Sequence, residues 1–223
     1  MKKPEHPLHG YLRQISERAE VREGVPLPMG THENGAGVNF AFFSRHASRV
    51  WLQLFERPAD GTAFRVIALD RASNRTGDVW HVWVEGIRPG QLYAYRVEGP
   101  YHPREGNRYN LHKLLLDPFA TAISPMPSWD FRPAPGYDPL APEQDLTFSS
   151  VDNTSAMPKC VFAQKDFDWQ GARSPRHSWS KTVVYETHVR GFAIHPSSGA
   201  ENPGTYLGAK NEPSKAADGD EGG

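Results

Sequence analysis

The feature that most constrains this chain is a series of short segments between residues 37 and 99 in which apolar and polar residues alternate. The segments cover residues 37–44, 49–56, 64–70, 78–86 and 91–99. In the second of them Val50, Leu52 and Leu54 recur at every second position, which is the pattern of a β-strand with one buried face. Alternating strands with a turn about every 8–12 residues are typical of an antiparallel sandwich. The sequence therefore predicts a mainly β fold built around an immunoglobulin-like antiparallel β-sandwich.

Several aromatic residues lie on these predicted strands and on the loop that follows them. A flat ring can stack on the apolar face of a sugar while neighbouring polar groups bind its hydroxyls. Four residues are therefore candidates for binding a carbohydrate substrate: Trp80, Trp83, Tyr95 and Tyr101. The alternative is that such rings fill the core of the sandwich, the usual place for aromatic residues on strands.

The loop after the last of these strands is long and polar. Its sequence, GPYHPREGNRYN, spans residues 99–110 and contains two tyrosines and two arginines. Binding residues are over-represented on loops that a rigid scaffold positions, although a merely solvated loop has the same composition.

The composition disfavours several classes of function. The chain has 25 Lys and Arg against 26 Asp and Glu, so no basic excess points to a nucleic-acid partner. The single cysteine, Cys160, excludes an internal disulfide and a multi-cysteine metal site, and the ten histidines are scattered. No glycine-rich phosphate-binding motif occurs. We therefore expect no nucleic-acid partner, no metal and no cofactor.

The N-terminal region predicts a helix and no targeting segment. Leu8, Leu12, Ile15 and Ala19 have the spacing of one amphipathic helix within residues 8–19, so residues 1–24 are predicted to be a helical extension. No apolar run follows the two N-terminal lysines. We therefore expect neither a secretory signal nor a membrane-spanning helix, and a cytoplasmic location.

The segment KTVVYETHVRGF, residues 181–192, predicts a strand of a different kind. Val183, Val184 and Tyr185 form its apolar part, and polar residues then follow at every second position. Such strands are usual in parallel α/β barrels, where the chemistry gathers at the C-terminal ends. Glu186 and His188 share one face and could do acid–base work, but filling a polar interior is the alternative. A barrel needs about 250 residues, whereas 31 residues follow Phe192 in this sequence.

Five phrases, in this order, carry a resemblance to a known family. They are GVNFAFFSRHASRVWLQLF, GDVWHVWVEGIRPGQLYAYRVEGPYHPREGNRYNLHKLLLDPFA, AMPKCVF with FDWQG, TVVYETHVRGF and GTYLG. Over residues from about 25 to 208 the chain resembles the N-terminal part of bacterial glycogen debranching enzymes and isoamylases, which are members of the α-amylase superfamily.

The resemblance implies a domain organisation. Residues 25–123 would be a carbohydrate-binding module of family 48, residues 124–180 an irregular linker, and residues 181–208 the first strand and loop of a truncated (β/α)8 barrel. Residues 209–223 depart from the family and are expected to be a disordered tail. In the family an aspartate nucleophile and a glutamate acid/base hydrolyse α-1,6 branch points with retention. No position of this sequence matches their motifs, so no catalytic residue is carried over.

The resemblance also implies a function. The chain would be a fragment of an α-1,6-glucan debranching hydrolase that carries its glucan-binding or support module, with an α-glucan such as glycogen as partner, and inactive by itself. The alternatives are a non-enzymatic α-glucan-binding module, or a fragment of a branching enzyme or of a trehalose-releasing hydrolase. An uncovered apolar strand is a template for pairing with another chain, so self-association through residues 181–192 is also expected, unless the segment folds back onto the sandwich.

Overall fold

The computed structural model describes residues 19–125, 130–163 and 168–210. The chain divides into two compact units, residues 1–166 and 167–223. The helix predicted within residues 8–19 and most of the predicted tail lie outside the described residues. No helix among the described residues has the length and apolar character needed to cross a bilayer.

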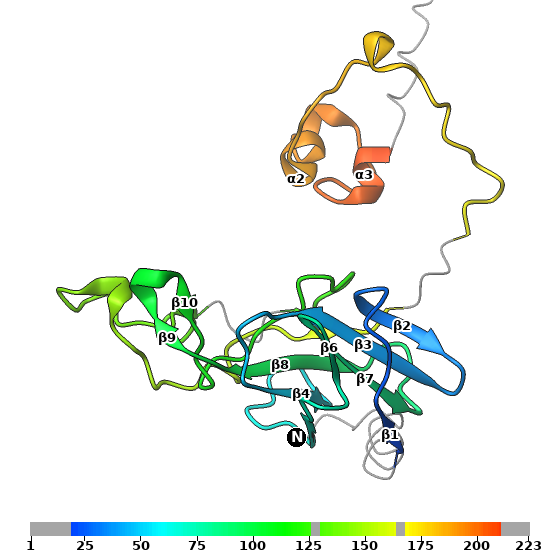
Figure 1. Ribbon diagram of the computed structural model, residues 1–223. Helices are drawn as coiled ribbons and strands as arrows, with labels where there is room; N and C mark the ends of the chain where they lie inside the picture. The colour runs from blue at the N-terminus through cyan, green and yellow to red at the C-terminus, as the bar shows by residue number, and fades with distance from the viewer. Residues whose placement is uncertain (1–18, 126–129, 164–167, 211–223) are drawn as a thin grey trace, which may run out of the picture. The chain divides into compact units, whose positions relative to one another are not determined.

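The first unit contains an antiparallel sheet of five strands (Figure 1). Its strands are β1 (Val21–Arg22), β2 (Gly30–Asn34), β3 (Gly37–Phe43), β6 (Arg75–Thr76) and β7 (Val79–Glu85). The order is β1-β7-β3-β2, and β6 also pairs with β7. The long pairing runs from Gly37 opposite Glu85 to Phe43 opposite Val79.

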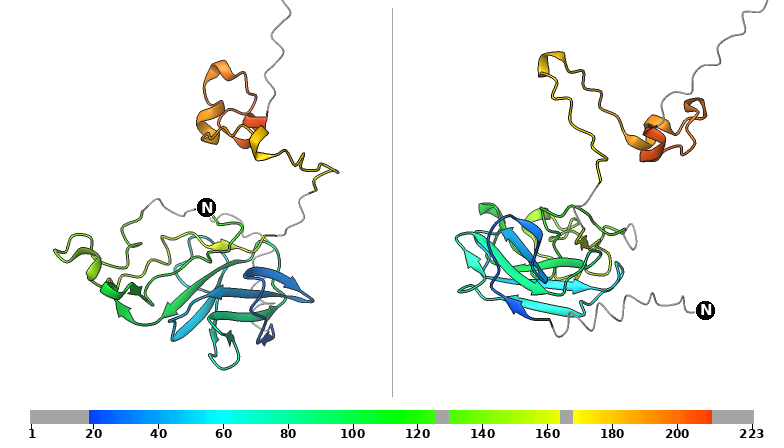
Figure 2. Two further views of the ribbon diagram at one scale, coloured as in Figure 1. Left: turned by 45° about the horizontal axis from the view of Figure 1, so that its top comes forward. Right: turned by 90° about the vertical axis from the view of Figure 1, so that its right-hand side faces the viewer.

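A second antiparallel sheet of four strands packs on the first (Figures 1 and 2). Its strands are β4 (Arg49–Phe55), β5 (Arg65–Leu69), β8 (Leu92–Glu98) and β11 (Cys160–Val161). The order is β11-β8-β4-β5, so β5 and β11 are the edge strands. The predicted immunoglobulin-like sandwich is thus observed as two stacked antiparallel sheets.

The core lies between the two sheets and consists of the alternating residues that the sequence predicts. Val50, Leu52 and Leu54 of β4 are buried, as are the residues of β7 that share a face with Trp80. Rings from the two sheets meet there, with Phe40 edge-on to Tyr93 at 5.2 Å between centroids. Burying each such side chain stabilises the fold by about 1.5–3 kcal/mol, so this alternation selects the register of the sheets.

The sandwich unit extends beyond residue 123, where the sequence analysis placed its end. Cys160 and Val161 of β11 pair with Tyr93 and Leu92 of β8, and Ile123 forms a single bridge with Cys160. The boundary between the two units falls after Asp166 instead. The proline-rich stretch has no regular pattern of its own, so its attachment to the sheet depends on long-range pairing that periodicity does not reveal.

The second unit contains short helices only, within the residues described. These are η3 (Trp179–Lys181), α2 (Val189–Ala193), η4 (Pro196–Ser198) and α3 (Tyr206–Lys210), and α2 contacts α3 (Figure 1). The predicted strand within residues 181–192 is wrong, because residues 182–188 have no regular secondary structure. A strand needs a neighbour to satisfy its backbone groups, and in the described part of the chain no strand pairs with this segment. A barrel strand is therefore not observed.

Candidate carbohydrate-binding cleft

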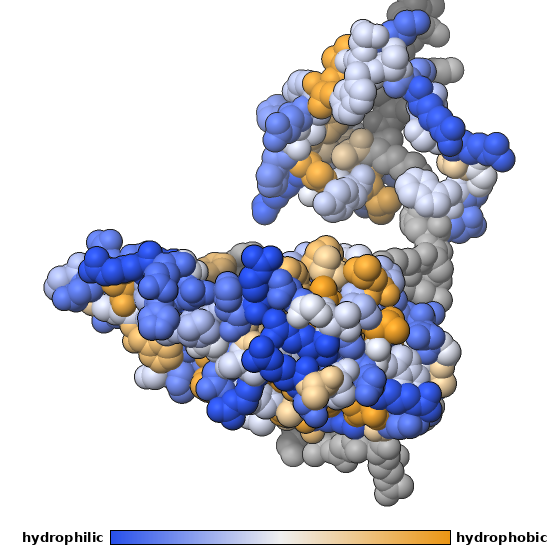
Figure 3. Space-filling model, viewed as in Figure 1, coloured by the Kyte–Doolittle hydropathy of each residue, from blue (hydrophilic) through white to orange (hydrophobic). Residues whose placement is uncertain are grey.

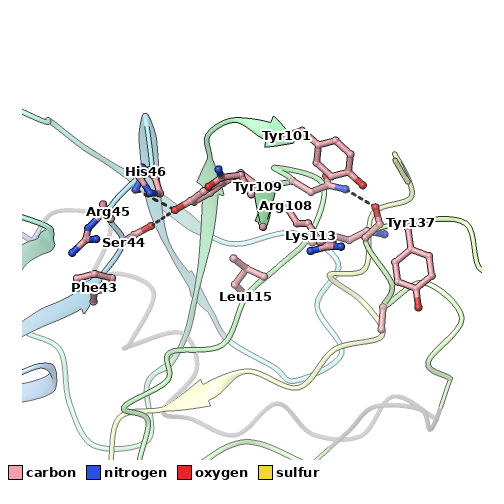
Figure 4. Close-up of a pocket in the computed structure, with 15 residues that line it drawn as sticks. Phe43, Ser44, Arg45, His46, Tyr101, Arg108, Tyr109, Lys113, Leu115 and Tyr137 are labelled. Atoms are coloured by element: carbon pink, nitrogen blue, oxygen red, sulfur yellow. Dashed lines mark hydrogen bonds between the residues drawn. The ribbon is translucent and has the colours of Figure 1, made fainter. Parts of the chain in front are cut away.

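A cleft of about 770 Å³ lies at one end of the sandwich (Figure 4). One wall is the turn between β3 and β4, residues 43–46, and the other comes from residues 101–113 and 134–137. Its lining includes five aromatic rings, those of Phe43, His46, Tyr101, Tyr109 and Tyr137. An aromatic lining with a few convergent polar groups is the usual make-up of a small-molecule site.

A short hairpin presents one wall of the cleft. β9 (Tyr101–His102) pairs with β10 (Asn107–Arg108), and the helix η1 (Pro103–Glu105) joins them. Gly106 ends η1 with φ of 83°, a left-handed conformation that favours glycine. The pairing sets Tyr101 opposite Arg108, so both reach the cleft from neighbouring strands.

Tyr109 joins the two walls. Its hydroxyl lies 3.2 Å from Oγ of Ser44 and accepts a hydrogen bond of 3.3 Å from the backbone N–H of His46. Its ring packs so closely on Gly99 that a Cβ there would lie 2.6 Å from the ring. Gly99 thus allows the close approach that lets Tyr109 reach the turn between β3 and β4.

Buried polar side chains hold the floor of the cleft. The ammonium of Lys113 donates to the carbonyl oxygens of Pro133 and Val151, at 2.9 and 2.7 Å, and to Oγ of Ser149 at 3.2 Å. Burial lowers the pKa of Lys113. Asn110 donates to the carbonyl oxygen of Ser149 at 2.8 Å. These bonds attach residues 133–151, which have little regular structure, to the sandwich.

The charged groups of the cleft are already paired. Arg45 donates to Asp78 at 2.8 Å, and this hydrogen bond lowers the pKa of the Asp78 carboxyl. Arg108 donates to Asp145 at 2.7 Å. On the face shown in Figure 3, the surface over β9, β10 and η2 (Gln144–Leu146) is predominantly hydrophilic. The cleft thus suits an uncharged polar ligand better than an anion or a cation.

Other groups in the cleft are available to a ligand. Within the described residues, the side chains of His46, Asn107 and Tyr137 make no hydrogen bond, and the ring of Phe43 is half exposed. The hydroxyl of Tyr101 donates to the carbonyl oxygen of Thr147, and the ring lies edge-on to Phe148 at 4.9 Å. The cleft therefore combines ring faces with unpaired polar groups, an arrangement suited to a sugar.

Among the four sequence-predicted residues, only Tyr101 lines the cleft. Trp80 and Tyr95 are buried in the core, where no ring face is accessible to a sugar, and Trp80 donates to the carbonyl oxygen of Ser44 at 3.1 Å. Trp83 is only 7% exposed. The guanidinium of Arg22 lies 4.7 Å above its ring.

The sequence reasoning missed Phe43, His46, Asn107 and Tyr137. Asn107 lies in the polar loop of residues 99–110, and the composition of that loop indicates a surface region where binding residues are common. Phe43 and His46 come from the turn between β3 and β4, and Tyr137 comes from the irregular stretch after residue 130. They carry no local signal, because only the fold brings them to this loop.

Glu186 and His188 do not form an acid–base pair in the structure. Both side chains are exposed, and no hydrogen bond joins them among the described residues. Instead, Nδ1 of His188 accepts from the backbone N–H of Gly191 at 3.4 Å and caps the N-terminus of α2. Likewise, the residues that the structure describes include no group of three His, Cys, Asp or Glu arranged to hold a metal ion.

The sandwich is similar to a known family of carbohydrate-binding modules. Residues 28–120 match the model of the family described as carbohydrate-binding module 48, the isoamylase N-terminal domain. This region is therefore similar to a family 48 module. It includes both sheets of the sandwich except β1 and β11, and the cleft lies mostly within it, since only residues 134–137 come from outside.

Curated relatives extend the similarity past the module. The chain is 41% identical over 189 residues to a glycogen debranching enzyme of Yersinia enterocolitica, and 40% identical over 189 residues to one of Yersinia pseudotuberculosis. Each match covers 84% of this chain and 26% of the relative. The chain thus spans about a quarter of the length of these relatives, and the resemblance to bacterial glycogen debranching enzymes is confirmed.

Solved structures share the fold. A pullulanase from Bacillus acidopullulyticus matches with a TM-score of 0.56 and 20% identity, over 86% of this chain and 19% of its own. The pullulanase from Paenibacillus barengoltzii in complex with maltohexaose and α-cyclodextrin matches with a TM-score of 0.53 and 19% identity, over 90% of this chain and 24% of its own.

Proposed function

We propose that this chain is the α-glucan-binding part of an α-1,6-glucan debranching hydrolase and that the cleft described above binds the glucan. The observation that carries the proposal is the pairing of the cleft's arginines and lysine with protein groups, while within the described residues three polar side chains make no hydrogen bond and the ring of Phe43 stays half exposed. A glucose chain offers apolar ring faces and neutral hydroxyls, and matches both.

The relatives support the class of ligand. The 41% identical proteins are glycogen debranching enzymes. A structural neighbour was solved with maltohexaose and α-cyclodextrin, which are α-linked glucans. The proposed partner is therefore glycogen or a branched maltodextrin. A cytoplasmic location is part of the same proposal, since glycogen is an intracellular store.

Two alternatives have different consequences. A non-enzymatic glucan-binding module would bind glycogen without turnover in any context. A fragment of a branching enzyme or of a trehalose-releasing hydrolase would carry the same module, but the whole enzyme would catalyse a different reaction. The high identity to debranching enzymes over 84% of the chain favours the debranching assignment.

The experiment is titration of the whole chain with maltohexaose by calorimetry, with glycogen affinity electrophoresis as a second readout. Substituting Asn107→Ala or Tyr137→Ala should each weaken binding about fivefold, because each removes about 1 kcal/mol of hydrogen bonding or stacking. The matched controls are Asn34→Ala and Tyr206→Ala, whose side chains are exposed and do not line the cleft. Equal affinities for the cleft variants and the unaltered chain would exclude this cleft as the site.

An assay of reducing ends released from glycogen separates binding from turnover. We expect the chain to bind without releasing reducing ends, because no catalytic carboxylate has been identified in it. Activity that copurifies with the chain would contradict that part of the proposal and leave the binding result intact.

A further inference from the structure

The strand β5 leaves one edge of the sandwich open. It pairs with β4 on one side, and among the described residues no strand pairs with it on the other. Ile67 and Leu69 point into the core, whereas Val66 is 52% exposed and Ala68 is exposed beside it. An open edge with apolar residues on its outer face is a template for an added strand.

A second segment of the same chain is apolar, extended and unpaired. Within residues 182–188, Val183, Val184 and Tyr185 are 94%, 74% and 79% exposed. The segment begins and ends in extended conformation, with φ and ψ of −99° and 128° at Thr182 and of −83° and 120° at His188. Backbone hydrogen bonds to a neighbouring strand would turn this segment into a β-strand.

We propose that residues 182–188 of one copy of this chain add to the open edge of β5 in a second copy, as an antiparallel strand. Among the described residues no segment covers Val66, Ala68 or residues 183–185, which leaves both surfaces available to another molecule. This inference does not depend on the glucan-binding proposal.

Charge selects the direction and the register of the pairing. When Glu186 is placed opposite Arg65 in an antiparallel arrangement, Lys181, the last residue of η3 and the residue before the segment, falls opposite Asp70, so both ends of the pairing carry opposite charges. A parallel arrangement over the same residues would oppose Lys181 to Arg65 and Glu186 to Asp70, which are like charges. A shift of one residue in either direction loses both charge pairs.

The same register matches the apolar residues. Val183 lies opposite Ala68 and Tyr185 opposite Val66 on the outer face, and Val184 lies opposite Ile67 on the inner face. A tyrosine beside a β-branched residue is a favourable cross-strand pair. Each exposed apolar residue of the segment therefore gains an apolar neighbour.

Arg65 supplies an independent reason for an acidic partner. Its Nη2 donates to the carbonyl oxygen of Ala19 at 2.8 Å, but its Nη1 is buried and has no hydrogen-bond partner within the described residues. Since an unpaired buried donor is costly, the carboxylate of Glu186 from a second copy would satisfy a group that the single chain leaves unpaired.

The test combines sedimentation with disulfide trapping on the whole chain. We expect the mass in solution to rise with concentration from 24.9 kDa towards twice that value. Reversing one exposed charge, in Asp70→Lys or in Lys181→Asp, should weaken the association about tenfold, and the double variant should restore it. Both residues are exposed, but Asp70→Lys also removes the hydrogen bond of 2.8 Å that Oδ1 of Asp70 accepts from the backbone N–H of Ala72, so the melting temperature of each variant is compared with that of the unaltered chain.

Trapping tests the register directly. The variant with Ala68→Cys and Val183→Cys should form a disulfide-linked dimer under mild oxidation, because the two residues are opposed on one face. The matched control has Ala68→Cys with Val184→Cys, whose side chain points to the other face, and should not. A chain that stays monomeric at all concentrations, equal trapping of both variants, or a disulfide formed within one chain would each overturn the proposal.

Discussion

The hydroxyl of Tyr109 lies 3.2 Å from Oγ of Ser44 and thereby ties the loop after β8 to the turn between β3 and β4. The two residues are 65 positions apart in the sequence, and they sit on opposite walls of the cleft. Together with the bond that this hydroxyl accepts from the N–H of His46, the contact ties the two walls to each other.

Removing the hydroxyl should loosen the cleft. In Tyr109→Phe, the contact with Ser44 and the bond from the N–H of His46 are both lost, which should lower the free energy of unfolding by about 1–2 kcal/mol. Affinity for maltohexaose should fall as well. Urea denaturation measures the first effect and calorimetric titration the second.

The control for this change is Tyr137→Phe, which deletes a hydroxyl that makes no hydrogen bond within the described residues. Its stability should equal that of the unaltered chain. A Tyr109→Phe variant as stable as Tyr137→Phe would show that the contact does not hold the walls.

Lys159 should be essential for attaching residues 154–160 to the sandwich. It is fully buried, and its ammonium donates to the carbonyl oxygens of Pro58, Thr154 and Met157. Lys159→Met keeps the length of the side chain but leaves three acceptors unpaired, which should cost about 2–4 kcal/mol of stability. The exposed Lys181→Met is the matched control, and equal melting temperatures would contradict the expectation.

The same lysine should make stability depend on pH. Burial lowers the pKa of Lys159 from 10.5 to about 8, so above pH 8 the unfolded chain binds more protons at this residue than the folded chain. The contribution of Lys159 to the free energy of unfolding should therefore rise by about 1 kcal/mol between pH 8 and 9.

Comparison with Lys159→Met isolates that contribution from those of other groups. The difference in unfolding free energy between the two proteins should shift in favour of the unaltered chain as the pH rises from 8 to 9. A difference that stays constant over this interval would show that the pKa of Lys159 is not lowered.

Cys160 should be unreactive in the folded chain. Its side chain is fully buried on β11, which pairs with β8, and burial raises the pKa of the thiol to about 11. Because the thiolate is the reactive form, an aromatic disulfide reagent should label the chain only after denaturation, with one thiol per chain. Rapid labelling under native conditions would show that β11 detaches readily from the sheet.

Tyr101 and Trp80 show how much of the candidate site could be predicted from the sequence. Trp80 shares its face of the strand with Val82 and Val84, and that pattern correctly indicates a buried position. Tyr101 belongs to a polar loop, and that context correctly indicates a surface position. Aromatic character alone does not separate the two, because stacking on a sugar and packing in a core require the same kind of ring.

The burial of Trp83 could not be predicted from the alternation of residues along its strand. Its position on the face opposite Trp80 suggests exposure, but the stacked guanidinium of Arg22 covers it. Arg22 lies 61 residues earlier in the chain and reaches the ring because β1 pairs with β7. No local pattern predicts a contact of this range.

The sequence by itself determined the strands of the sandwich and the residues that fill its core, because side chains on a strand alternate between two faces and burial selects one of them. Only the tertiary structure decided where the unit ends, which residues line the cleft and what became of residues 182–188. The physical reason is that each of these depends on a partner distant in the sequence: β8 for β11, the turn at residues 43–46 for Tyr109, and a neighbouring strand for the apolar segment. An alternating or apolar pattern indicates that a segment can form a strand, but whether it does so depends on a neighbouring strand that only the tertiary structure supplies.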